Sequence, residues 1–451
     1  MRIHFIAIGG SAMHNMAIAL HKKGVQVSGS DDEIFEPSKS RLLKYNLLPK
    51  NIGWEPEKLD HTIDAIILGM HARKDNPELL RAQELGLEIY SYPEYIYEQS
   101  KDKFRVVIGG SHGKTSITSM VMHVLKTLQR DFDYLVGAQL EGFETMVRLS
   151  DAPLIIIEGD EYLSSPIDRR PKFLWYKPNL AVISGIAWDH INVFPTFKNY
   201  LEQFQLFVES IEENGSLIYY KNDTVLNQIV NQSKNSIEFV AYESHPHRIE
   251  NGQTQLKTSV GNLAIQVFGE HNLQNLMAAL EICMQLDISK EDFYKAISSF
   301  QGAAKRLELI GKNEHSLVYK DYAHSPSKLK ATTEAVKKQY PKKHLIACME
   351  LHTFSSLTKE FLGEYSGSMS AADEAVVYFN PKTIQHKGLE AISVTEIEAH
   401  FLPSKVKVFN DSEKVKSYLE KNNLKNSVLL LMTSGNFDGV DLNQLGKQLT
   451  A

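Results

Sequence analysis

Short hydrophobic runs alternate with amphipathic stretches along the whole chain. Buried strands are predicted for the apolar runs HFIAI, FRVVIGG, LIIIE, LAVISGI, HLIACMEL and SVLLLM. Helices are predicted for AMHNMAIALHKKG and SKLKATTEAVKKQ, where apolar residues recur at helical spacing. This alternation of strands and helices predicts an α/β fold with mostly parallel sheets.

The pattern divides into three blocks, each of which begins with its own strand, turn and helix. A chain of 451 residues has room for about two to four domains. We predict a Rossmann-like domain over residues 1–102, a central P-loop ATPase domain with a mostly parallel sheet over 103–301, and a Rossmann-like domain over 302–451.

Composition narrows the class of protein. Lys+Arg is 49 and Asp+Glu is 55, a net charge of −6, which argues against a nucleic-acid partner. No apolar stretch is long enough to cross a membrane, and the start MRIHFIAIGG is no signal sequence, so we expect no membrane partner. The two cysteines, Cys283 and Cys348, predict neither a structural disulfide nor a zinc site. We therefore expect a cytoplasmic protein.

The stretch IGGSHGKTSIT predicts a phosphate-binding loop between a strand and a helix. Glycines let backbone N–H groups approach a phosphate, the lysine reaches the β- and γ-phosphates, and the hydroxyl ligates Mg²⁺. Ile108 stands where the general G-x-x-x-x-G-K-T pattern has its first glycine. We predict ATP as the ligand of Gly110, Ser111, His112, Gly113, Lys114, Thr115 and Ser116.

Two further strands of the central block end in polar residues. LIIIEGDEY delivers Glu158, Asp160 and Glu161 to the edge that faces the nucleotide in a P-loop fold, where a carboxylate can hold Mg²⁺. A solvated acidic loop is the alternative. LAVISGIAWDH ends in Asp189 and His190, and His190 is either a metal ligand or a structural histidine.

The first glycine turn, AIGGSAM, is the weaker motif. Ala7 and Ala12 occupy the outer glycine positions of G-x-G-x-x-G, which disfavours a nicotinamide oxidoreductase. The turn can still hold a diphosphate at the start of the following helix. A P-loop kinase or motor ATPase would account for the second glycine loop alone, and a regulator that binds sugar nucleotides without catalysis would account for the first.

The motifs HFIAIGGSAM, SGSD, GGSHGKTS, EGDEY, WDH, GEHNLQN, KRLE and DYAHSP occur in the order typical of the Mur ligase family, the ATP-dependent amide ligases of peptidoglycan precursors. The chain resembles that family over essentially its whole length. The resemblance implies a UDP-sugar-binding domain, an ATPase domain and a C-terminal domain that closes on ATP. It departs from the family at Ala7, where a glycine is usual, and YLEQFQLF lacks the lysine that several members carbamylate.

The resemblance also implies a reaction and roles for individual residues. ATP phosphorylates the lactyl carboxylate of UDP-N-acetylmuramate, and an amine then displaces phosphate from the acyl phosphate. The implied catalytic residues are Lys114, Glu158, His190 and Arg306; the Mg²⁺ ligands Thr115, Glu158 and His190; the further ATP contacts Asn272, Asn275 and Asp321; the UDP-sugar contacts Gly9, Gly10, Ser11, Ser30 and Asp31; and the other substrate contacts Arg169, Arg170, His324 and Ser325.

Two amine substrates fit the resemblance. EIFEPSKSRL, EYLSSPIDRRPKFLWYKPN and MTSGNFDG are similar to the members that attach L-Ala-γ-D-Glu-meso-diaminopimelate, the favoured substrate. GMHARKDNPEL and MELHTFSSL are at least as similar to the members that add L-alanine. The sequence carries no signal for the oligomeric state.

Overall fold

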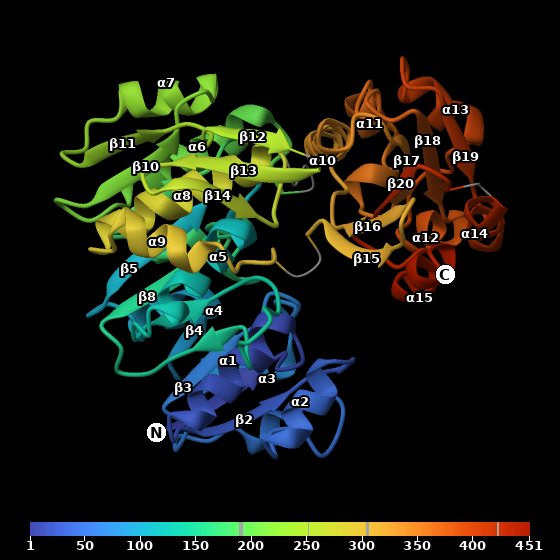
Figure 1. The fold of residues 1–451 in the computed structure, drawn as a ribbon. Coiled ribbons are helices and arrows are strands. Elements are labelled where there is room, and N and C mark those ends of the chain that lie inside the picture. Colours follow the sequence, from blue (N-terminus) through green and yellow to red (C-terminus); the bar gives the residue numbers. More distant parts are fainter. Residues whose placement is uncertain (189–192, 251, 304–305, 422–423) are drawn as a thin grey trace. The chain divides into compact units, whose positions relative to one another are not determined.

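The computed structural model describes residues 1–188, 193–250, 252–303, 306–421 and 424–451. The chain forms two compact units (Figure 1). The first contains residues 1–188, 193–243 and 278–288, and the second contains 244–277 and 289–451. Within these described residues, no helix has both the length and the apolar character that a membrane crossing requires.

The first sheet of the first unit is parallel and has the strand order β2-β1-β3-β4. From β1 the chain continues to β2 on one side and then to β3 on the other side. The carboxyl end of β1 is therefore a topological switch point, the usual place for a ligand in such a sheet. Its elements are β1 (Arg2–Ile6), α1 (Ser11–Lys22), β2 (Gln26–Ser30), α2 (Ser38–Lys44), the 3₁₀ turn η1 (Pro56–Lys58), β3 (Ala65–Leu68), α3 (Pro77–Glu84), β4 (Ile89–Ser91) and α4 (Tyr92–Glu98).

The second sheet has the order β11-β10-β9-β5-β8-β6-β7 and is parallel except for β7. The central strand β5 pairs with β8 and β9, so the loops after these three strands share one edge. The elements are β5 (Phe104–Gly109), α5 (Lys114–Thr127), β6 (Asp133–Leu135), β7 (Val147–Arg148), β8 (Leu154–Glu158), η2 (Lys172–Trp175), β9 (Leu180–Ile183), α6 (Phe197–Glu209), β10 (Ser216–Tyr220), α7 (Thr224–Gln232) and β11 (Glu238–Tyr242).

One hydrophobic core joins the two sheets of the first unit. Met13 and Met16 of α1 belong to the same buried cluster as Val147 and Leu149, which flank the end of β7. Burial of apolar surface contributes about 25 cal/mol per Å², so this shared core fixes the first sheet to the second. The glycine turn after β1 and the P-loop after β5 therefore belong to one rigid framework.

The second unit contains a small antiparallel sheet and a larger, mostly parallel one. The small sheet consists of β12 (His247–Glu250), β13 (Gln253–Thr258) and β14 (Gly261–Ile265). The larger has the order β15-β16-β20-β17-β18-β19, and only β15 is antiparallel to its neighbour. Its strands are β15 (Glu308–Lys312), β16 (Leu317–Asp321), β17 (His344–Leu351), β18 (Glu374–Phe379), β19 (Val406–Phe409) and β20 (Ser427–Met432).

Helices cover both faces of the larger sheet, and the buried side chains form two clusters, one on each face. The remaining helices of the chain are α8 (Glu270–Gln285), α9 (Lys290–Ile297), α10 (Pro326–Gln339), α11 (Lys359–Leu362), α12 (Pro381–His386), α13 (Val394–His400), α14 (Ser412–Lys421) and α15 (Leu442–Leu449), with the 3₁₀ turns η3 (Ser355–Leu357) and η4 (Gly363–Tyr365).

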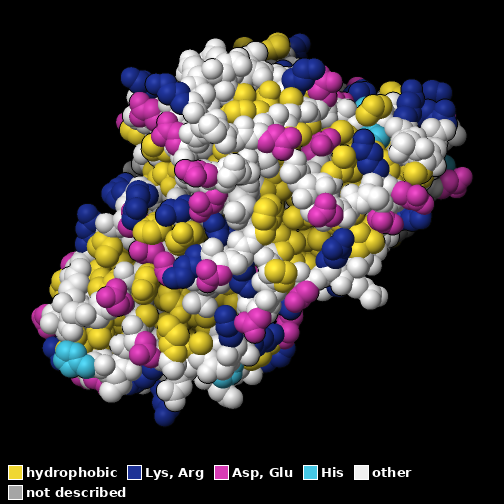
Figure 2. Space-filling model, turned by 90° about the vertical axis from the view of Figure 1, so that its left-hand side faces the viewer, with side chains coloured by type: hydrophobic (Ala, Val, Ile, Leu, Met, Phe, Trp, Pro, Cys, Tyr) yellow, Lys and Arg dark blue, Asp and Glu magenta, His cyan; other side chains and the backbone are white. Residues whose placement is uncertain are grey.

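The predicted α/β class with mostly parallel sheets is confirmed. The domain limits at 102/103 and 301/302 stay predictions. On the face in Figure 2, basic and acidic side chains are interspersed and hydrophobic side chains lie between them. This mixture of signs accords with the small net charge of −6.

Candidate active site

The P-loop follows the central strand of the second sheet. Gly110 and Gly113 have positive φ angles of 122° and 80°, a backbone region that glycine adopts without the penalty of a Cβ atom. A side chain at Gly110 would also collide with Ser184 at the end of the neighbouring strand β9. Lys114 begins α5, a helix of 14 residues, so its first N–H groups are available to an anion. The loop thus has the form that phosphate binding requires.

Lys114 already has an anionic partner. Its Nζ donates to the carbonyl oxygen of Gly110 at 2.7 Å and pairs with Oε2 of the fully buried Glu161 at 2.5 Å. Burial by itself would lower the pKa of Lys114, but the charge of Glu161 outweighs it and raises the pKa above the usual range. The lysine is therefore held as a cation at the P-loop.

A hydroxyl network holds Glu161 in turn. The Tyr200 hydroxyl donates to Oε1 of Glu161 at 3.1 Å, and it lies 2.8 Å from the Ser111 hydroxyl. The sequence analysis placed Glu161 among the carboxylates at the nucleotide edge without a role of its own, and it missed Tyr200 altogether. Tyr200 lies on α6, 39 positions from Glu161. Only the fold brings it to the loop.

Thr115 and Glu158 come together as predicted. The Thr115 hydroxyl donates to Oε1 of Glu158 at 2.8 Å, and the N–H of Gly137 donates to Oε2 at 2.8 Å. Burial raises the pKa of Glu158, which lies close to a second carboxylate, Asp160. A hydroxyl and a desolvated carboxylate are the hard oxygen ligands that Mg²⁺ prefers, so these two side chains fit that ion.

His190, the predicted third metal ligand, lies outside the described residues, as does Asp189. Among the residues described, no three His, Cys, Asp or Glu side chains are grouped so that they could hold a metal ion. The metal role of Thr115, Glu158 and His190 therefore stays a prediction. Asp160, the other acidic residue of EGDEY, pairs with Lys172 at 2.6 Å.

The basic loop proposed to contact substrate is partly engaged. Arg170 pairs with Asp168 through two hydrogen bonds of 2.9 and 3.2 Å and lies 4.0 Å from the ring centre of Trp175. Arg169 is exposed and makes no hydrogen bond or ion pair with another described residue. A substrate contact stays a prediction for both arginines. To contact a substrate, Arg170 would have to break its hydrogen bonds with Asp168.

The first glycine turn lies at the switch point of the first sheet. Asp31 Oδ2 accepts the Gly9 N–H at 2.6 Å, and the Ser30 carbonyl accepts the N–H groups of Ala7 and Ile8 at 2.9 and 3.1 Å. Burial raises the pKa of Asp31 to about 6. Gly10 and Ser11 follow at the N-terminus of α1. The predicted UDP-sugar residues Gly9, Gly10, Ser11, Ser30 and Asp31 thus form one turn.

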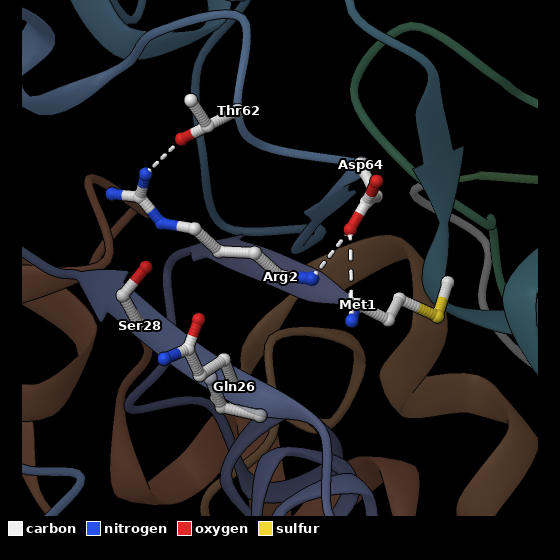
Figure 3. A pocket seen from close by; sticks show the side chains of 7 residues that line it. Met1, Arg2, Gln26, Ser28, Thr62 and Asp64 are labelled. Carbon is white, nitrogen blue, oxygen red and sulfur yellow. Dashed lines mark hydrogen bonds and ion pairs between the residues drawn. The ribbon is translucent and has the colours of Figure 1, made fainter.

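A cavity of about 710 Å³ opens at the opposite edge of this sheet (Figure 3). Its lining includes Arg2 and Gln26, which begin β1 and β2, and Thr62 and Asp64, which precede β3. Ligands of open α/β sheets bind at the carboxyl ends of the strands. This cavity lies at the amino ends of the strands, so despite its size we do not assign the nucleotide to it.

One segment, residues 137–147, connects the surroundings of the two turns. Gly137 holds Glu158, as described above, and Gln139 Oε1 accepts a hydrogen bond from Arg41 at 2.8 Å. Further along, the Met146 N–H donates to Asn15 of α1 at 2.9 Å. Glu144 between them pairs with the lysines of α1 and α2, Lys22 at 2.7 Å and Lys44 at 3.1 Å.

The remaining predicted site residues belong to the second unit. Asp321 is buried and accepts the N–H groups of Leu307 at 2.5 Å and Ala323 at 2.7 Å. Arg306 lies 5.0 Å from the ring centre of Tyr322. His324 Nδ1 lies 2.8 Å from the carbonyl oxygen of Tyr322, and Ser325 caps α10 without a side-chain hydrogen bond. The roles predicted for them toward ATP and substrate stay predictions.

Asn272 and Asn275 are both buried in the first turns of α8. The Asn272 amide donates to the carbonyl oxygen of Phe268 at 2.8 Å, a local bond that stabilises the helix start. The adenine contact proposed for these two residues stays a prediction.

A cavity of about 250 Å³ lies at the carboxyl ends of β16 and β20 in the second unit. Lys320 and Asp321 line it from β16, and the loop after β20 lines it with Ser434, whose buried hydroxyl has no hydrogen-bond partner among the described residues. The buried Glu350 holds this loop by accepting the Phe437 N–H at 2.9 Å. The cavity is lined by Lys320, Asp321, Tyr322, Thr433, Ser434, Gly435, Asn436, Val440, Asp441, Leu442 and Asn443.

Three family models match successive parts of the chain. They are "Mur ligase family, catalytic domain" at residues 2–104, "Mur ligase middle domain" at 108–283 and "Mur ligase, glutamate ligase domain" at 305–435. A UDP-N-acetylmuramate–L-alanine ligase of Caldicellulosiruptor bescii is 30% identical over 83% of this chain and 82% of its own length. A ligase of the same name from Desulfitobacterium hafniense is 26% identical over 100% and 99%.

Solved structures share the fold over the whole chain. A murein peptide ligase of Psychrobacter arcticus has a TM-score of 0.66 and 21% identity, covering 99% of both chains. A UDP-N-acetylmuramate–alanine ligase of Thermotoga maritima has a TM-score of 0.69 and 19% identity, covering 97% of this chain and 96% of its own.

The chain belongs to the Mur ligase family. It is accordingly an ATP-dependent, ADP-forming amide ligase of peptidoglycan precursors. The family membership inferred from the order of the sequence motifs is confirmed.

Proposed function

We propose that this ligase joins the amino group of L-Ala-γ-D-Glu-meso-diaminopimelate to the lactyl carboxylate of UDP-N-acetylmuramate. The observation that carries this choice is the cavity of about 250 Å³ beside the MTSGNFDG loop. A water molecule takes about 30 Å³, so this volume corresponds to about eight water-sized groups. Alanine has only six non-hydrogen atoms, whereas one residue of a peptide substrate would occupy such a space.

The chemistry of the cavity also suits a peptide. Lys320 offers a cation, Asp441 offers a carboxylate, and the Ser434 hydroxyl is free to bind a polar group. A buried hydroxyl without a partner costs free energy on the order of 1–3 kcal/mol, which a ligand hydrogen bond would remove. The distal end of diaminopimelate carries both an ammonium and a carboxylate, and this lining offers a partner to each.

The proposed reaction has two steps. A carboxylate oxygen of UDP-N-acetylmuramate attacks the γ-phosphorus of ATP, and ADP leaves. The neutral amine then attacks the carbonyl carbon of the acyl phosphate, loses a proton, and displaces inorganic phosphate to leave the amide. The protein contributes mainly positioning and stabilisation of charge.

The residues of the first unit have matching roles in the proposal. Lys114 would leave Glu161 or bridge it to the β- and γ-phosphates, where its charge is needed. Thr115, Glu158 and His190 would hold Mg²⁺, which supplies further neutralisation of phosphate charge. The turn at Gly9, Gly10 and Ser11, with Ser30 and Asp31, would hold the UDP-sugar.

We also propose the residues that act from the rest of the chain. Asn272 and Asn275 would contact adenine, Asp321 the ribose and Arg306 the phosphates. The sugar and peptide would meet Arg169, Arg170, His324 and Ser325. We retain the domain limits 1–102, 103–301 and 302–451, and we propose a cytoplasmic location because both cysteines are free thiols.

L-Alanine is the second candidate for the amine. It is favoured by the names of the curated relatives cited above, which are 30% and 26% identical to this chain. It is also favoured by GMHARKDNPEL and MELHTFSSL. With L-alanine the chain would make the first amide bond of the precursor, whereas with the tripeptide it would return a preformed peptide to the sugar nucleotide.

A direct assay separates the two amines. The protein is incubated with ATP, Mg²⁺ and UDP-N-acetylmuramate, with L-alanine, the tripeptide or no amine, while ADP release and product mass are measured. We expect kcat/KM at least about tenfold higher with the tripeptide, a difference of about 1.4 kcal/mol. Equal or better use of L-alanine would overturn the proposed substrate.

A matched pair of variants tests the cavity itself. Ser434→Ala removes the unpartnered hydroxyl, and we expect it to raise KM for the tripeptide several-fold while KM for ATP stays unchanged. Ser417→Ala on α14 is the control, because Ser417 does not line the cavity. An unchanged tripeptide KM in Ser434→Ala would remove the cavity from the peptide site.

A further inference from the structure

A buried polar network crosses the first sheet beneath its helix α3. His4 on β1 stands opposite Ser28 on β2, and its Nδ1 lies 2.9 Å from the Ser28 hydroxyl. Its Nε2 lies 3.2 Å from Oε2 of Glu78 on α3. His4 is 3% exposed and Glu78 is fully buried. An acid and a base thus face each other inside the domain.

Glu78 also holds the chain just before η1. Its Oε1 accepts the Glu55 N–H at 2.8 Å. Burial alone would raise the pKa of Glu78, but the hydrogen bond and charge of His4 outweigh it and hold the pKa below the usual range. A buried pair of this kind gives little net stability compared with apolar residues of the same size. Its presence calls for another reason.

The segment 53–55 connects this network to the first glycine turn. The N–H of Gly53 donates to the Asp31 carbonyl oxygen at 2.8 Å, two residues before the Glu55 that Glu78 holds. The Ser30 carbonyl oxygen accepts the N–H groups of Ala7 and Ile8, and the Asp31 side chain accepts the N–H of Gly9. Three consecutive amides of the turn are therefore fixed by two residues, and the second of these is joined through Gly53 to the segment that the buried acid holds.

We propose that His4 and Glu78 are positioning residues for the sugar nucleotide: through the segment 53–55 and Asp31 they hold the turn at residues 7–9 in the conformation that receives the diphosphate. The inference rests on the proposed binding of UDP-N-acetylmuramate at this turn. Ligand geometry is commonly set by a second layer of buried hydrogen bonds that never touches the ligand. His4 and Glu78 supply that layer on the side of the turn away from α1.

The test measures UDP binding and the turn separately. Glu78→Gln removes the carboxylate, and His4→Gln keeps a donor near Glu78 but removes the imidazole, so one variant remains should the other fail to fold. Leu79→Ala is the matched control, because Leu79 is the adjacent fully buried residue of α3 and belongs to the apolar cluster of the same domain. Calorimetry gives the Kd of UDP alone and of ADP alone for each protein below its unfolding midpoint.

We expect Glu78→Gln and His4→Gln to weaken UDP binding about tenfold or more and to leave the Kd of ADP within twofold of the wild type. Leu79→Ala should lower the unfolding midpoint without changing the Kd of UDP. UDP binding within twofold of the wild type in both network variants would overturn the proposal. So would an equal loss in Leu79→Ala, because the network would then only stabilise the fold.

Amide hydrogen exchange in the ligand-free proteins separates this proposal from the proposed function. The two network variants should exchange the amides of residues 7–10 at least about tenfold faster than wild type and Leu79→Ala. If wild-type protein does not bind UDP, the sugar-nucleotide assignment fails, and exchange alone decides whether the network positions the turn. Unchanged exchange at residues 7–10 overturns the proposal in either case.

Discussion

The two glycine turns of the first unit share a topology and differ in charge. Each follows a central parallel strand and opens a helix, α1 after β1 and α5 after β5. The P-loop is followed by a cation, Lys114, and by Thr115, whose hydroxyl donates a hydrogen bond to the Glu158 carboxylate. The first turn, residues 7–11, contains no lysine or arginine, and the Asp31 carboxylate accepts a hydrogen bond from its Gly9 N–H.

The difference shows how one framework is adapted to two tasks. A triphosphate that must be broken requires a fixed positive charge and oxygen ligands for a metal ion. A nucleotide that only has to be held needs backbone amides and a helix N-terminus. The P-loop has the charge for the first task and the helix start after the first turn suits the second, so in the proposed function the charge distinguishes the site of chemistry from the site of sugar-nucleotide binding.

The largest effect should come from Lys114→Ala. Without the lysine, the transferring phosphoryl group loses its fixed cation, so we expect ADP release and ligation to fall at least about 10³-fold. The change also leaves Glu161 buried without its cation, so the unfolding midpoint should fall, and the rates are compared below the midpoint found by thermal denaturation. Ligation near the wild-type rate would mean that the two turns do not differ in the way described.

Glu158→Gln should have the next largest effect. The amide keeps the shape of the side chain but loses the charge that suits Mg²⁺, so we expect a fall of about 10²-fold in kcat and a higher Mg²⁺ requirement. Rates measured across a Mg²⁺ titration test this, and Asp160→Asn serves as the comparison because Asp160 pairs with Lys172. An unchanged Mg²⁺ dependence in Glu158→Gln would contradict the metal role.

Asp31→Asn should change the pH dependence of stability. The pKa of Asp31 is raised from 3.8 to about 6, so between these values the native state binds a proton that the unfolded chain has lost. The contribution of Asp31 is therefore fully present below about pH 4 and is lost as the pH rises to about 6. Urea midpoints of the wild type, compared with those of Asp31→Asn from pH 4 to pH 7, should show this extra fall in the wild type alone.

Ala7→Gly should have the smallest effect, and it should stabilise the protein. Ala7 has a φ of 68°, a left-handed conformation that costs a residue with a Cβ atom about 1 kcal/mol. Glycine removes that strain but adds flexibility to the unfolded chain, so we expect a gain of at most about 1 kcal/mol by urea denaturation. A loss of stability would show that the alanine methyl group contributes more through packing than its conformation costs.

The sequence predicted the parts of the fold that are locally encoded. The strands HFIAI and LIIIE, the helix that begins beside Lys114 and the meeting of Thr115 with Glu158 all followed from apolar runs and turn residues. The antiparallel sheet β12-β13-β14 was missed, because in QTQLKT only Thr254 and Leu256 are buried and the polar residues resemble a loop.

The long-range part of the candidate site could not be predicted in the same way. Tyr200 reaches Glu161 because α6 packs its aromatic residues into the core. There the rings of Tyr200 and Phe204 lie edge to face, with their centres 5.2 Å apart. Nothing in the local sequence around Tyr200 indicates a phosphate loop. The anchoring of Glu55 by Glu78 likewise depends on where α3 lies against the sheet.

The pairing of Lys114 with Glu161 has a consequence for turnover. Because the Lys114 ammonium pairs with the buried Glu161 carboxylate, an anion that binds at the loop has to compete with that carboxylate for the lysine. In the proposed reaction, ADP would meet this competition from Glu161 once the γ-phosphoryl group has been transferred, and the carboxylate would thereby favour the release of ADP.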